Sequence, residues 1–156
     1  MVYQKSRREI KHVLLLGDSQ HEAISTFLKE CFHSDHGTVD NTEVVIMRSG
    51  PPSEEISALL SMVEYDSKVI YLEGSPLNHD DLRRCMADQA QCAVIMTNHF
   101  CENHQAEDYK NILSAFAIKK YVKQKHQVSG LDEMRVCLQI AKPEHKDLYY
   151  SGLAKS

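Results

Sequence analysis

Short apolar runs, separated by longer amphipathic segments, form the basic pattern of this chain. The runs lie at residues 12–16, 44–47, 69–72, 92–96 and 136–140, and none is long enough for a typical helix. The first four are almost continuously apolar instead of alternating with polar residues, which is typical of strands covered on both faces. The pattern therefore predicts five strands in a central, parallel sheet.

Amphipathic helices are predicted between these strands. Apolar residues recur at intervals of three or four within residues 23–32, 56–63, 82–86 and 112–121. Because strands and helices alternate, we predict an α/β fold: a doubly wound, mainly parallel sheet of five or six strands with helices on both faces. Ligands of such sheets bind at the carboxyl ends of the strands, so candidate functional residues are sought there.

Polar residues predict where three of the helices begin. Ser19 and Glu22 have the spacing of a capping box, in which each side chain bonds to a backbone N–H near the other residue. Ser53 precedes two glutamates, and Asn78 with Asp81 forms a third cap of a similar kind. All of these residues are assigned structural roles.

Composition and charge exclude several classes of protein. The chain has 156 residues, of which 42% are hydrophobic and 26% charged, as expected for one globular domain. Its net charge of −4, without a long run of one sign, favours neither nucleic acid nor an anionic membrane surface as a partner. The five cysteines form no close pair, which indicates a reducing compartment, and Cys85, Cys92 and Cys137 are predicted to be small buried hydrophobes.

The stretch from residue 11 to 32 begins like a dinucleotide-binding domain, with an apolar run, a turn at Gly17 and an amphipathic helix. The phosphate-binding fingerprint needs three glycines, and only Gly17 is present. The next strand ends in Arg48 instead of the acid that would hold a ribose. We expect Asp18 and the predicted cap to occupy the positive end of the helix, with Gly17 retained for the turn.

Residues 97–108 hold the densest cluster of carboxylate, amide, histidine and cysteine side chains. Two interpretations of Asn103, Glu107 and Asp108 remain open: oxygen ligands for a hard cation such as Ca²⁺, or caps of the following helix. A zinc site would take a different set, namely His99, Cys101 and His104. That set lacks a fourth ligand nearby and a familiar zinc spacing.

No pair of side chains suited to catalysis can be argued from the sequence. Ser75 and His79 lie four residues apart in a polar stretch, but the motif is not a nucleophile elbow. We therefore expect no enzymatic activity and no catalytic residue.

Residues 69–96, VIYLEGSPLNHDDLRRCMADQAQCAVIM, resemble the regulator-of-potassium-conductance (RCK) domain. The resemblance is carried by a strand, then Gly74, Leu82 and the small residue Cys85, then Ala90 and a second strand. This pattern belongs to the cytosolic module of ligand-gated potassium channels.

A second stretch makes the resemblance more specific. Residues 99–121, HFCENHQAEDYKNILSAFAIKKY, are similar to a segment of the Slo channels, the calcium- and sodium-activated potassium-channel family. Residues 11–17, 27–35 and 136–146 fit the same template. The resemblance therefore covers residues 11–146.

The resemblance implies that residues 11–146 are the N-terminal, Rossmann-like lobe of a first RCK domain. Residues 1–10 would be the linker from the pore region, and 147–156 the truncated start of the following segment. Such a domain joins other RCK domains in a gating ring under a tetrameric pore, on the cytoplasmic side of a membrane. It regulates the channel, because ion binding favours one arrangement of the ring over another.

The resemblance also implies a ligand and a site. Asp108 matches an aspartate of the ion site, and Asn103 stands where a second acid is found. Together with Glu107, a further oxygen ligand in the same stretch, they would form a partial cation site for Ca²⁺ or Na⁺. The remaining ligands would come from a region beyond the end of this chain. No other cofactor and no nucleotide is expected, and residues 124–133 are interpreted as an insertion. The alternative is a dinucleotide-binding lobe of an oxidoreductase or of a nucleotide-sensing potassium-transport regulator.

Overall fold

The computed structural model describes residues 1–4, 10–33, 41–126 and 134–153. Most of the predicted insertion at 124–133 lies outside these ranges, so its interpretation stays a prediction. In the part of the chain that is described, no helix is both long enough and apolar enough to span a bilayer.

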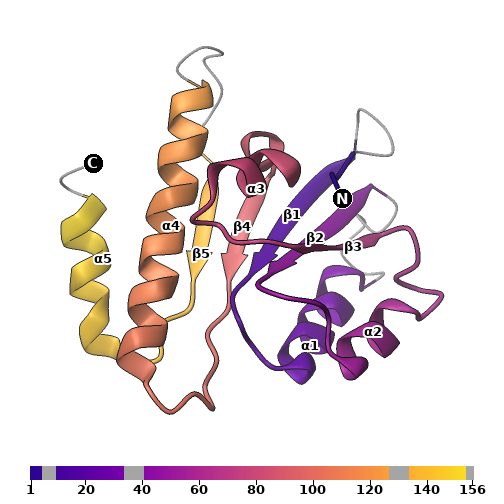
Figure 1. Ribbon diagram of the computed structural model, residues 1–156, viewed down its shortest axis with the longest axis horizontal. Helices are drawn as coiled ribbons and strands as arrows, with labels where there is room; N and C mark the ends of the chain where they lie inside the picture. The colour runs from indigo at the N-terminus through magenta and orange to yellow at the C-terminus, as the bar shows by residue number, and fades with distance from the viewer. Residues whose placement is uncertain (5–9, 34–40, 127–133, 154–156) are drawn as a thin grey trace.

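Five parallel strands form one sheet in the order β3-β2-β1-β4-β5 (Figure 1). The strands are β1 (Lys11–Leu16), β2 (Thr42–Arg48), β3 (Val69–Glu73), β4 (Cys92–Ile95) and β5 (Arg135–Leu138). The strand order reverses direction between β1 and β4, which is the topological switch point of a doubly wound sheet. The predicted fold class is confirmed, with five strands in the described residues.

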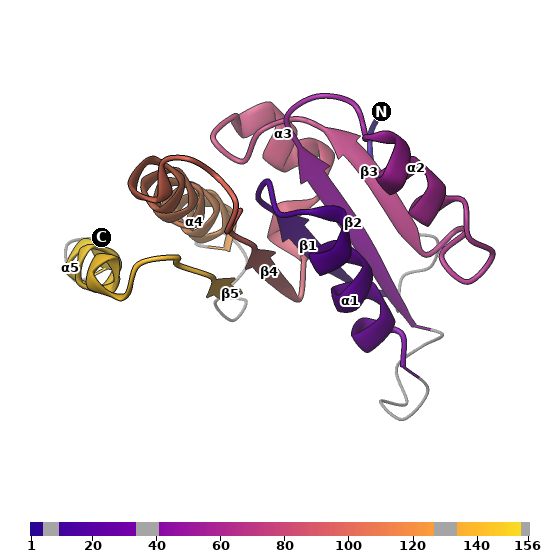
Figure 2. The same cartoon turned by 90° about the horizontal axis from the view of Figure 1, so that it is seen from below.

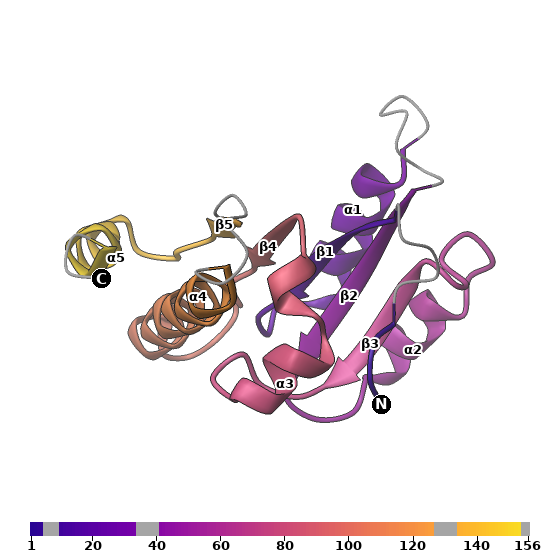
Figure 3. The same ribbon diagram turned by 90° about the horizontal axis from the view of Figure 1, so that it is seen from above.

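Helices cover both faces of the sheet (Figures 2 and 3). Helices α1 and α2 lie on one face, and α3 and α4 lie on the other, while α5 runs beside α4 away from the strands. The helices are α1 (His21–Cys31), α2 (Glu54–Leu60), α3 (His79–Arg84), α4 (His104–His126) and α5 (Lys146–Leu153), with 3-10 turns η2 (Ala87–Gln89) and η3 (Pro143–His145).

The continuous apolar runs follow from burial of both faces of the sheet. Successive side chains of a strand point to opposite faces, so Leu14 and Leu16 pack under α3 and α4 while Leu15 packs under α1 and α2. All three are at most 2% exposed. The edge strand β5 differs, because Cys137 is exposed while its neighbours Val136 and Leu138 pack against the core. The predicted burial is therefore correct for Cys85, met only in part by Cys92, which is half-buried, and wrong for Cys137.

Two of the three predicted helix caps are confirmed. The Ser53 hydroxyl accepts the N–H of Ile56 at 3.3 Å, and the Asn78 side chain accepts the N–H of Asp80 at 2.9 Å. Asp81 does not cap that helix; it accepts the N–H of Ser75 at 3.0 Å instead.

The predicted capping box at the start of α1 is wrong. The helix begins after Gln20, which makes no side-chain cap bond. Ser19 is 2% exposed and its hydroxyl donates to the sulfur of Met96 at 3.7 Å, while Glu22 is on the surface beside His21. Ser19 is buried because the preceding turn presses against the end of β4, and this tertiary contact outweighs the local capping motif.

Candidate functional site

The turn after β1 lies at the switch point of the sheet, where a doubly wound fold binds its ligand. Gly17 adopts a φ of +96°, in the region that favours glycine. A Cβ atom there would lie 2.0 Å from the carbonyl oxygen of Met96. Glycine is therefore required by the backbone itself, as the sequence predicts.

Charged side chains of the protein line the cleft beside this turn. Asp18 pairs with Arg48, at 3.7 Å between Oδ1 and Nε, and with the Nζ of Lys110. Lys110 also lies 3.8 Å from Glu107, whose other oxygen accepts the N–H of Asn98 at 3.3 Å. This chain of contacts joins the ends of β1, β2 and β4 to the first turns of α4. We call it the cleft ion network.

The cleft ion network places charged side chains of the protein where a nucleotide-binding fold would hold its ligand. A bound pyrophosphate needs free backbone N–H groups and close approach at this turn. Here the Asp18 carboxylate supplies the negative charge, and Arg48, the cation that could have met a 2′-phosphate, already contacts that carboxylate. Asp18 pairs with Arg48 and Lys110, and whether its carboxylate also occupies the positive end of α1 stays a prediction. The dinucleotide alternative therefore gains no support from the geometry.

Asp108 is the most deeply buried acid of the predicted site, with no exposed surface. Its carboxylate accepts the backbone N–H groups of Ala141 and Lys142 at 2.7 and 3.0 Å. The Nδ1 of His145 lies 2.7 Å from the same carboxylate. Asp108 thus ties the second turn of α4 to the segment that follows β5, which contains η3.

The electrostatics of Asp108 follow from these contacts. Burial by itself raises the pKa of a carboxyl, because it disfavours the charged form. The bonds from Ala141, His145 and Lys142 favour the carboxylate more strongly, and they hold the pKa of Asp108 below its usual value. Asp108 is therefore a buried anion that is fully engaged with the protein.

This lowered pKa predicts how stability depends on pH. The Asp108 carboxylate stabilises the fold above the pKa of an unfolded aspartate, about 3.9, and this contribution is lost as the pH falls through the lower folded value. Urea unfolding of the wild type and Asp108→Asn from neutral to acid pH checks it. The wild type should be more stable at neutral pH, and the difference should shrink in acid. A difference that is constant over the whole range would contradict the assignment.

Asn103 and Glu107 have other neighbours. The Asn103 side chain accepts the N–H of Ala106 at 3.0 Å and caps α4, as one of the two interpretations predicts. Glu107 belongs to the cleft ion network and is 10% exposed. Since the oxygens of Asn103, Glu107 and Asp108 meet different donors, the three side chains do not fit a shared cation site in this arrangement. Calcium or sodium binding here stays a prediction.

The zinc set of histidines and cysteine is also incomplete. The sulfur of Cys101 lies 3.3 Å from Nδ1 of His104, at the start of α4. Within the described ranges, no group of three or more histidine, cysteine or acidic residues is arranged to hold a metal ion.

Two side-chain contacts of the candidate site were not predicted from the sequence. Lys110 meets Asp18 across 92 positions, and His145 meets Asp108 across 37. A signal was available in principle, because the carboxyl ends of parallel strands share one edge of the sheet and bring their loops together. That rule predicts that these loops lie close together, but it does not predict which side chains contact each other.

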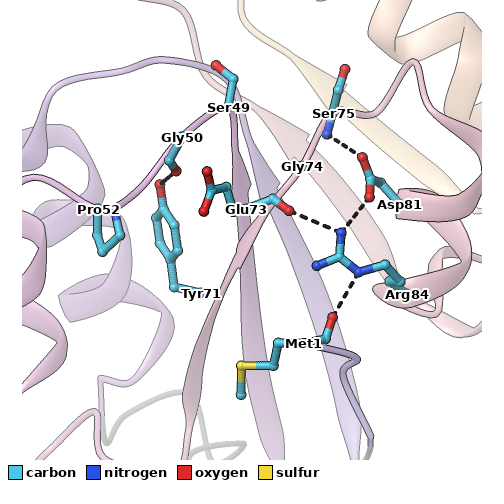
Figure 4. Close-up of a pocket in the computed structure, with 10 residues that line it drawn as sticks. All are labelled: Met1, Ser49, Gly50, Pro52, Tyr71, Glu73, Gly74, Ser75, Asp81 and Arg84. Atoms are coloured by element: carbon cyan, nitrogen blue, oxygen red, sulfur yellow. Dashed lines mark hydrogen bonds and ion pairs between the residues drawn. The ribbon is translucent and has the colours of Figure 1, made fainter.

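A polar pocket of about 680 Å³ lies beside the cleft, at the carboxyl ends of β2 and β3 (Figure 4). Its wall groups mainly bond to one another: the Tyr71 hydroxyl donates to the carbonyl of Gly50 at 2.9 Å, and the Arg84 guanidinium donates to the carbonyl of Glu73 at 3.1 Å and to Asp81. The hydrogen bonds of the pocket wall therefore connect two loops and α3 to one another.

The doubly wound sheet, the ion pairs at its switch point and the buried acid on α4 define a Rossmann-like domain without the glycine fingerprint of a nucleotide site. The model of the calcium-activated potassium channel slowpoke-like RCK domain matches residues 8–143. The chain therefore belongs to this family, and the family resemblance seen in the sequence is confirmed.

Individual relatives agree with this assignment. The calcium-activated potassium channel slowpoke of Drosophila melanogaster is 29% identical over 136 residues, which are 87% of this chain and 10% of that channel. The human SLO3 gating ring superposes with a TM-score of 0.66 at 22% identity, covering 90% of this chain and 21% of that one. The GsuK RCK domain gives a TM-score of 0.57 at 13% identity, with 96% and 25% covered. These two structures support the fold alone.

Proposed function

We propose that this chain is the regulatory domain of a Slo-type potassium channel, where it assembles with other RCK domains into a gating ring and couples ion binding to opening of the pore. The family match over residues 8–143 is the observation that carries the proposal. The domain would lie on the cytosolic side of the membrane and have no enzymatic activity. The chain spans about a tenth of the length of slowpoke, so the pore and the other domains belong to the rest of such a channel.

The regulatory ligand is proposed to be Ca²⁺ or Na⁺. Support comes from the name of the slowpoke relative and from the oxygen-rich start of α4. Asp108, Asn103 and Glu107 are engaged with the protein, so a cation would need them to reorient or would take ligands from another segment. A ligand shifts the ring only by its difference in affinity between two arrangements.

A chimera tests the proposed function. Deleting the segment of slowpoke that matches residues 8–143 should abolish calcium-activated potassium current, and inserting these residues in its place should restore that current. The measurement is current in inside-out patches, with calcium stepped on the cytosolic side. Surface labelling separates a channel that fails to reach the membrane from one that fails to open. A chimera that reaches the surface but stays silent at all calcium levels would contradict the proposal.

A further inference from the structure

Residues 1–4 pack against the body of the domain, and we call them the N-terminal strap. Tyr3 is 2% exposed and lies in the same apolar core as Val45, Met47 and Leu72, on the face of the sheet that α3 covers. A segment predicted from the resemblance to be a linker thus contributes a buried side chain to the core.

Tyr3 contacts three elements of the fold. Its backbone N–H donates to the carbonyl of Arg84 at 2.8 Å, at the end of α3. Its hydroxyl donates to the carboxylate of Glu43, near the start of β2. Its ring centroid lies 4.8 Å from that of His12, which is the β1 neighbour of Glu43 in the sheet. One side chain therefore fastens the strap to the amino ends of β1 and β2.

The contact between Tyr3 and Glu43 is buried on both sides, since Glu43 is only 4% exposed. Burial, followed by the bond to Glu43 and the charge of Glu43, raises the pKa of the Tyr3 hydroxyl, so the hydroxyl stays a donor throughout the physiological range. Releasing the strap would expose the ring and break this charge-assisted bond together.

Arg84 extends the connection to the far edge of the sheet. Its Nε donates to the carbonyl of Met1 at 2.8 Å, and its Nη1 donates to the carbonyl of Glu73, at the end of β3. Figure 4 shows Met1, Arg84 and Glu73 along one wall of the polar pocket. The strap therefore contacts the amino ends of β1 and β2 through Tyr3, and it is linked to the carboxyl end of β3 only through Arg84.

We propose that the N-terminal strap is a force-bearing anchor, with Tyr3 as the residue that holds it. Force applied to the chain ahead of the strap then acts on β1, β2 and α3, because the strap stays bound to them. Without the anchor, the same force would first detach the residues that precede β1. This inference rests on the proposed function and on residues 1–10 being the linker from the pore region, as the family resemblance implies.

Optical tweezers measure the anchor directly on this chain. One handle is attached ahead of Met1 and the other at Lys120, an exposed position on α4, so that α5 carries no load. The wild type should hold the strap until the domain unfolds. Tyr3→Phe, which keeps the ring and removes the hydroxyl, should release the strap first, at lower force, and the extension gained should be at most about 36 Å, the extended length of ten residues.

Two further variants control this test. Tyr150→Phe removes a hydroxyl from a tyrosine that is 65% exposed, and its traces should match the wild type. Glu43→Gln keeps an acceptor without the charge and should release the strap at an intermediate force. An early release in the wild type, or identical traces for wild type and Tyr3→Phe, would overturn the anchor. Either result leaves the chimera experiment unaffected, so the two proposals fail separately.

Discussion

Replacing Asp108 by alanine is expected to lower the free energy of unfolding by about 3–5 kcal/mol. The substitution leaves the backbone N–H groups of Ala141 and Lys142 without their acceptor, and it removes the partner of His145. Asp108 has no exposed surface, so water cannot replace these bonds without opening the structure. The loss should appear in urea unfolding at neutral pH.

The matched control for this prediction is Asp80→Ala. Asp80 also lies in the first half of a helix and pairs with Arg83 at 3.1 Å, but its side chain is 70% exposed. Exposed pairs contribute little, so we expect a loss of about 1 kcal/mol or less. Equal losses for the two variants would mean that the contacts of Asp108 add nothing beyond an ordinary surface acid.

The strands and the fold class were predictable because their signals are local. A run such as residues 69–72 is apolar throughout, and it marks β3 (Val69–Glu73) almost residue by residue. Burial on both faces leaves this mark at every position of a strand, so no knowledge of its neighbours is required. The helix α4 was harder to delimit, since its polar first two turns extend from His104 to residue 111 and resemble a loop.

The errors arise where a distant contact outweighs a local motif. Ser19 and Glu22 have ideal spacing for a capping box. The turn at Gly17, however, places the Ser19 hydroxyl against the sulfur of Met96. Nothing within a few residues of Ser19 signals that contact. The same reason applies to Lys110, whose partner Asp18 lies on another element.

The candidate site shows both sides of this limit. Asp108 was singled out from the family resemblance and from its acidic neighbourhood, and it proves to be buried and engaged on all sides. Its role as a tie between α4 and the segment after β5 depends on the pairing of β4 with β5, which periodicity does not specify. Asp108 could thus be identified from the sequence, whereas its contacts could be seen only in the folded structure.

Replacing Gly17 by alanine is expected to be among the most damaging single substitutions in this domain, with a loss of about 4 kcal/mol or more. The new Cβ would meet the Met96 carbonyl oxygen at 2.0 Å and its carbonyl carbon at 3.0 Å. These are backbone atoms, and the Met96 N–H is itself bonded to the carbonyl of Leu16 at 2.9 Å, so they cannot move aside as a flexible side chain would. Relief of the clash requires β1 and β4 to separate at the switch point.

Gly50→Ala separates this clash from backbone strain. Gly50 has a similar φ of +88°, but a Cβ there meets nothing within 4 Å. Its loss should be limited to about 1–2 kcal/mol, the cost of a left-handed conformation for alanine. Thermal and urea unfolding of both variants give the comparison. Losses that are equal for Gly17→Ala and Gly50→Ala would show that strain alone explains Gly17, and the close approach of β1 and β4 would then carry no energetic weight.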